Sequence, residues 1–69
     1  MFNERTKIKE IMHIPDILEI VEKYTKVKMN MNTLKMGANF TIGMVGKYFH
    51  WTKIQMREIL EELNKKSQS

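Results

Sequence analysis

The sequence contains no cysteine, a single proline and only three glycines. Without cysteine, neither a disulfide nor a thiolate metal site can reinforce the chain. The two histidines, His13 and His50, lie far apart, and neither belongs to a metal-ligand motif. The shortage of turn-forming residues favours helices over many short strands. We therefore expect an all-α protein with no metal site and no cofactor.

Long apolar runs are also missing. No stretch approaches the length of a membrane span or of a signal peptide's apolar core, which predicts a cytoplasmic protein with no membrane association. Sixty-nine residues are enough for one domain, covering 1–69. A chain this short buries only about 60% of its unfolded surface, so its stability is marginal. Without disulfides or a metal site, formation of a homodimer is the remaining way in which the fold could be stabilised further.

Acidic residues are absent from a long central stretch, residues 23–57. The acids gather before and after it, while the stretch itself carries seven basic residues: Lys23, Lys26, Lys28, Lys35, Lys47, Lys53 and Arg57. Such an electrostatic asymmetry indicates a polyanionic partner. The alternative is a lysine-rich surface that only contacts water.

The first half of the chain shows helical spacing of apolar residues in two places. The first pattern predicts a short helix over residues 4–12. Pro15 suits the first turn of a second helix, predicted over residues 15–27 with a broad apolar face. Residues 28–40 fit either a short strand, because apolar and polar residues alternate, or a helical turn at 33–36. We leave these alternatives open.

Two threonines mark the helices of the second half. Thr41 is a suitable N-cap for a helix over 42–49, and Thr52 for a longer helix over 53–66. The polar tail 67–69 is expected to be disordered. The connection between the helices is about two residues long, and a connection that short forces them to cross steeply.

A steep crossing needs a small residue where the first helix faces the second, and Gly46 occupies that place. The stretch 41–63 resembles the helix-turn-helix of winged-helix and related transcription regulators, with its threonine caps, tight turn and Leu60-x-x-Leu63 ending. His50 stands where the turn residue is usually glycine, so we expect a positive φ there. The chain leaves no residues for a wing. The expected fold is a three- to four-helix bundle containing a helix-turn-helix at about 41–64.

The resemblance implies that the second helix of the pair enters the major groove of double-stranded DNA. It implies base contacts from the start of that helix and phosphate contacts from residues around it. The first set is Thr52, Lys53, Gln55 and Arg57, and the second is Lys47, Thr41 and Lys35. The predicted function is that of a small regulatory or accessory DNA-binding factor.

A protein-binding adaptor is the alternative, because helix-turn-helix cores also serve protein contacts. Such an adaptor would dock on a larger replication, transcription or partition factor through methionine and aromatic side chains. Among the consecutive aromatics 48–51, Tyr48 is the one expected outside the core. We find no activated nucleophile and no phosphate-binding loop, and adjacent carboxylates such as Glu61 and Glu62 diverge around the helix, so the sequence does not predict an enzyme.

Overall fold

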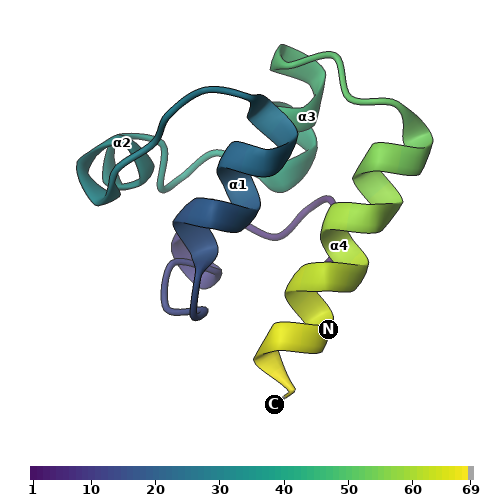
Figure 1. The fold of residues 1–69 in the computed structure, drawn as a ribbon, viewed down its shortest axis with the longest axis horizontal. Helices are drawn as coiled ribbons and strands as arrows, with labels where there is room; N and C mark the ends of the chain where they lie inside the picture. Colours follow the sequence, from purple (N-terminus) through teal and green to yellow (C-terminus); the bar gives the residue numbers. More distant parts are fainter. Residues whose placement is uncertain (69) are drawn as a thin grey trace.

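The structure, a computed structural model, describes residues 1–68 and confirms an all-α fold. Within that range it has one 3-10 helix and four α-helices: η1 (Ile8–Glu10), α1 (Ile17–Thr25), α2 (Met31–Met36), α3 (Ile42–Tyr48) and α4 (Lys53–Ser67). The helices form a compact bundle with extents of 27 × 24 × 20 Å. Figure 1 shows α2 and α4 on opposite sides of α1.

The N-terminal segment is less helical than its apolar spacing suggests. The predicted helix over 4–12 is wrong, since only the single turn η1 forms there. The N–H groups of Ile8 and Lys9 donate instead to the carbonyls of Phe40 and Ala38, at 2.8 and 3.0 Å. Pairing with the loop before α3 therefore replaces the hydrogen bonds that a longer helix would make.

Helix α1 is shorter at both ends than the predicted 15–27. It is preceded by Asp16 and followed by Lys26, both with a left-handed backbone at φ 62° and 59°. The N–H of Lys26 donates to the carbonyl of Glu22 and closes the last turn. The next residue, Val27, leaves the helix and is 48% exposed, so the apolar face ends earlier than its spacing indicates.

The segment that the sequence left open, 28–40, contains a helix. Its N-cap is Asn30, whose side-chain oxygen accepts a hydrogen bond from the N–H of Thr33 at 2.9 Å. Helix α2 then runs to Met36 and ends at Gly37. This cap favours the helix over the short strand, because it satisfies one of the free N–H groups at a helix start.

Both predicted threonine caps are confirmed. The hydroxyl of Thr41 accepts from the N–H of Met44 at 3.1 Å, and that of Thr52 accepts from the N–H of Gln55 at 3.0 Å. At the start of α4, the Gln55 side-chain oxygen also accepts from the N–H of Thr52 at 2.9 Å, which completes a capping box. Helices α3 and α4 thus begin at the predicted residues.

The N-terminal segment is fastened to the end of α4. The N–H of Phe2 donates to Asn64 Oδ1 at 2.7 Å, and Asn64 Nδ2 donates to the carbonyl of Phe2 at 3.2 Å. Of the predicted tail 67–69, Ser67 is the last residue of α4, and Ser69 lies outside the described residues.

The core draws on every helix. Its buried apolar residues are Ile8, Ile11, Ile14, Ile17, Ile20, Val21, Leu34, Ile42, Ile59 and Leu63. Burying a side chain of this size contributes about 1.5–3 kcal/mol. Because η1 and α4 both supply members of the same cluster, the two ends of the chain stabilise one common core.

Candidate nucleic-acid interface

A tight turn, residues 49–52, joins α3 to α4. His50 has φ 59° there, which confirms the positive φ expected at this position. The N–H of Trp51 donates to the carbonyl of Gly46 at 2.9 Å and folds the turn back on α3.

Gly46 is the small residue that the crossing requires, as the sequence indicated. A Cβ built on it would lie 2.8 Å from Trp51 Cε3 and would also overlap the terminal methyl of Met56. Distances below 3 Å between such carbons are strongly repulsive, so a larger residue would push α3 away from the turn and from α4.

Trp51 also connects the turn to α1. Its indole Nε1 donates to the carbonyl of Tyr24 at 2.8 Å, and its ring lies 6.2 Å edge-on from the Tyr24 ring and 6.5 Å from the stacked ring of Phe49. The end of α1 is therefore held beside the turn. Lys26 lies two residues after Tyr24 and is exposed, so the same contact holds it near the turn. It is a basic residue that we did not predict for the site.

Helix α4 has two different halves. From its middle onward it is anchored in the core, through Ile59 and Leu63. Its first half exposes Lys53 and Arg57 and leaves Ile54 62% exposed. The start of α4 therefore presents positive charge and one large apolar side chain to solvent.

Two of the residues predicted to contact bases already have structural roles. Thr52 and Gln55 form the capping box, so the hydroxyl and the side-chain carbonyl are engaged with backbone N–H groups. The amide nitrogen of Gln55 takes no part in that capping box. Thr41 likewise caps α3, at the end of that helix farther from the turn.

The remaining predicted residues separate into two places. Lys47 is exposed and follows Gly46, near the turn. Lys35 is exposed on α2, which Figure 1 shows on the other side of α1 from α4, so it does not join the residues at the turn. We call Lys26, Lys47, Lys53 and Arg57 the basic turn surface.

One acidic side chain of α4, that of Glu62, contacts α1. Glu62 pairs with Lys23 at 2.8 Å and accepts from the Tyr24 hydroxyl at 3.2 Å. The hydrogen bonds from Lys23 and Tyr24 hold the pKa of Glu62 below its ordinary value, and the bond to Glu62 raises the pKa of Lys23. Burial, followed by the hydrogen bond to Glu62, raises the pKa of Tyr24.

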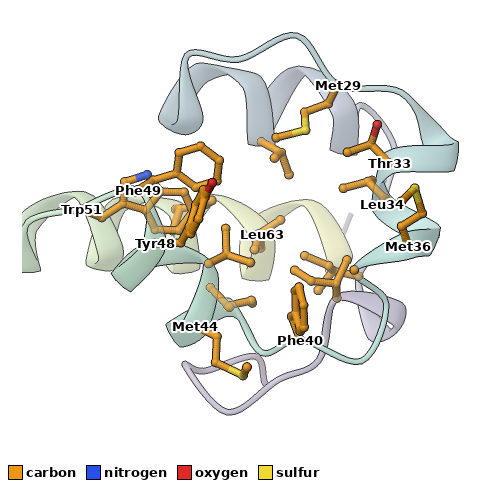
Figure 2. Close-up of a pocket in the computed structure, with 17 residues that line it drawn as sticks. Met29, Thr33, Leu34, Met36, Phe40, Met44, Tyr48, Phe49, Trp51 and Leu63 are labelled. Atoms are coloured by element: carbon orange, nitrogen blue, oxygen red, sulfur yellow. The ribbon is translucent and has the colours of Figure 1, made fainter.

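An apolar groove opens on the side of the core between α2 and α3 (Figure 2). Its volume is about 610 Å³. Core residues including Leu34, Ile59 and Leu63 line it, and the exposed residues of the lining include Met36, Phe40, Met44 and Tyr48. The exposure of Tyr48 that the sequence indicated is confirmed.

Residues 1–68 contain no helix that is both long and apolar enough to cross a membrane. In the same part of the chain, no three carboxylate, imidazole or thiol side chains converge as a metal ion would require. No protein-family model matches the chain, and no curated protein or solved structure is significantly similar to it. Function is therefore inferred from the geometry alone.

Proposed function

We propose that this protein binds double-stranded DNA by placing the first half of α4 in the major groove. One observation carries the proposal. Helix α4 is anchored from its middle onward by Ile59 and Leu63 and leaves Lys53 and Arg57 exposed in its first two turns. A helix fixed at one end and basic at the other is the arrangement by which helix-turn-helix proteins contact base edges.

The spacing on α4 suits such a contact. Lys53 and Arg57 are four residues apart and therefore lie on one face of the helix, about 6 Å apart along its axis. Arginine and lysine side chains recognise the O6 and N7 acceptors of guanine, and an apolar side chain such as Ile54 contacts the methyl group of thymine.

Phosphate contacts would come from the residues around the turn. Lys47 on α3 and Lys26 after α1 are exposed and belong to the basic turn surface. The ion pairs found within residues 1–68 use Lys23 and Lys66, and neither involves a member of that surface. These cations can therefore replace the counterions on a DNA backbone.

The role of Gln55 is revised by the capping box. Its carbonyl oxygen is engaged at the start of α4, so it cannot make the two-point contact with adenine that a free glutamine makes. We assign Gln55 to orienting α4, with its amide N–H groups as donors to the nucleic acid.

Fluorescence anisotropy of a labelled mixed-sequence duplex, titrated at about 50 and 200 mM salt, tests the proposal. We expect binding that weakens steeply between the two conditions. The double variant Lys53→Ala, Arg57→Ala should bind at least about tenfold more weakly and show a flatter salt dependence, because fewer counterions are released.

The matched control is the double variant Arg5→Ala, Lys65→Ala. It also removes one arginine and one lysine, both exposed, but outside the basic turn surface. It should keep most of the affinity. An equal loss in both double variants would indicate only non-specific attraction by net charge, and no binding at the lower salt by the folded protein would refute the proposal.

A further inference from the structure

The apolar groove between α2 and α3 is open space that the described side chains do not fill. Its volume of about 610 Å³ falls within the range of ligand-binding clefts. Its rim exposes large apolar side chains, with Met36 87%, Tyr48 77% and Phe40 53% exposed. Contiguous exposed apolar surface of this kind marks an interaction site in soluble proteins.

We propose that the groove binds an amphipathic helix of a protein partner, and that this helix carries acidic residues beside its apolar stripe. None of the residues lining the groove is charged. The proposal does not rest on DNA binding, because neither Lys53 nor Arg57 contributes to the groove.

Charge complementarity identifies the partner as acidic. Lys28, Lys35 and Lys47 are exposed, and each adjoins in the sequence a lining residue that is not buried: Met29, Met36 and Tyr48. Four acidic residues also adjoin the lining in the sequence, but only at its buried members Ile11, Val21, Ile59 and Leu63. The stretch 23–57, which supplies most of the lining, has no acidic residue. The carboxylate of Glu22 comes close, but it accepts a hydrogen bond from the N–H of Met29 at 2.8 Å. Carboxylates flanking the partner's apolar stripe would therefore meet lysines.

The lining favours a helix as the bound element. Met29, Met36 and Met44 all line the groove, and flexible thioether side chains adapt to the apolar face of a docked helix. Apolar residues at positions i, i+3 or i+4, and i+7 span about 10 Å.

A second copy of the chain fits the groove less well than an acidic helix. If two grooves faced each other across a two-fold axis, the lysines at 28, 35 and 47 of one copy would approach those of the other. Like charges brought together at an interface oppose association. The same lysines attract an acidic partner.

Trp51 provides the measurement, because it lines the groove and is the single tryptophan of the chain. The probe is an 18-residue helical peptide with leucine at i, i+3, i+7 and i+10, glutamate at most other positions, and no tryptophan or tyrosine. We expect a saturable change in Trp51 emission. A peptide with lysine in place of glutamate, and one with the same composition but scattered leucines, should bind at least about tenfold more weakly.

The variant Met36→Gln, Met44→Gln should reduce the affinity for the acidic peptide by at least about tenfold, since it removes apolar contact at the rim. Both side chains are more than half exposed, so the fold should survive, as thermal melting would verify. The control Val27→Gln, Met31→Gln changes two exposed apolar residues outside the lining and should bind like the wild type.

Three results would overturn the proposal. The first is an absence of saturable binding by the acidic peptide. The second is equal binding of the acidic and basic peptides, or of wild type and the rim variant. The third is a stable dimer in sedimentation equilibrium that the rim variant dissociates, which would assign the groove to a second copy. The double variant Lys53→Ala, Arg57→Ala, which tests DNA binding, should leave peptide binding and the sedimentation result unchanged. Failure of one proposal can therefore be told apart from failure of the other.

Discussion

Three residues other than glycine adopt a left-handed backbone within residues 1–68, and each lies at or beside a helix boundary. They are Asp16 before α1, Lys26 after it and His50 in the turn before α4. A left-handed conformation costs an ordinary residue about 1–2 kcal/mol. Aspartate and histidine tolerate it better than most, whereas lysine does not. The contacts next to Lys26 and His50 must therefore offset this cost, and Trp51 supplies several of them.

The close approach at Gly46 leads to a stability prediction. Gly46→Ala should destabilise the protein, because overpacking against the Trp51 ring costs about 1–3 kcal/mol and exceeds the gain of up to about 1 kcal/mol in helix propensity. Thermal unfolding followed by circular dichroism measures the loss, which should appear as a lower melting temperature.

Gly37→Ala is the matched control. Gly37 has a negative φ of −99°, and a Cβ there would lie 3.4 Å from the Phe40 ring, which is ordinary contact. We expect unchanged stability or a gain below about 1 kcal/mol. If Gly46→Ala were as stable as Gly37→Ala, α3 would not be held against Trp51 as described.

At the scale of elements, the start of α4 separates stability from binding. Gln55→Glu keeps the capping box, since glutamate accepts the same hydrogen bond, and it places a negative charge at the positive end of the helix. The melting temperature should stay the same or rise. Affinity for the duplex should fall by about tenfold at 50 mM salt, because the new carboxylate approaches phosphates.

Gln68→Glu makes the same change at the other end of α4, where Gln68 is the C-cap. Its DNA affinity should remain within a factor of about two of the wild type, as expected for a charge far from the contact. Equal weakening by both glutamates would mean that the start of α4 does not contact the duplex.

The two helices that begin with a threonine cap could be predicted from the sequence. Thr41 and Thr52 lie three residues before the N–H groups that they accept from, so the pattern alone contains the information. The N-terminal helix could not be predicted correctly, because Ile8 and Lys9 donate to carbonyls about thirty residues away. The end of α1 depends on the left-handed Lys26, which no propensity scale favours.

At the scale of the whole molecule, the contact between α1 and α4 makes stability depend on pH. The folded state lowers the pKa of Glu62 below its ordinary value of 4.5, mainly through the hydrogen bond from Lys23. This contribution is therefore complete well above pH 4.5 and is lost as the pH falls through the lowered pKa. It should be modest, because both side chains are partly exposed.

Glu62→Gln should lower the melting temperature by a few degrees near neutral pH, and the difference from wild type should shrink in acid, below the lowered pKa. Melting curves across this range provide the test. Glu61→Gln, an exposed position with no ion pair in the described part of the chain, is the control and should show a smaller difference. A difference for Glu62→Gln that stays constant with pH would contradict the assignment.

The basic turn surface and the apolar groove could be predicted only in part, because both depend on contacts between residues that lie far apart in the sequence. The charge of residues 23–57 and the exposed start of α4 follow from local patterns. Lys26 joins the turn only through the bond between Trp51 and Tyr24, which are 27 residues apart. The lining of the groove combines residues of α2 and α3 with Ile59 and Leu63, which are contributed from the far end of the sequence.

The pairing of Phe2 with Asn64 has a consequence for the order of folding. The N-terminal segment is fixed only once α4 is in place, since Asn64 holds Phe2 and its neighbour Leu63 is completely buried in the core. Contacts between such distant residues form late because the intervening loop must be closed first. We therefore expect the contact between Phe2 and Asn64 to be among the last to form, after α4 has packed on the core.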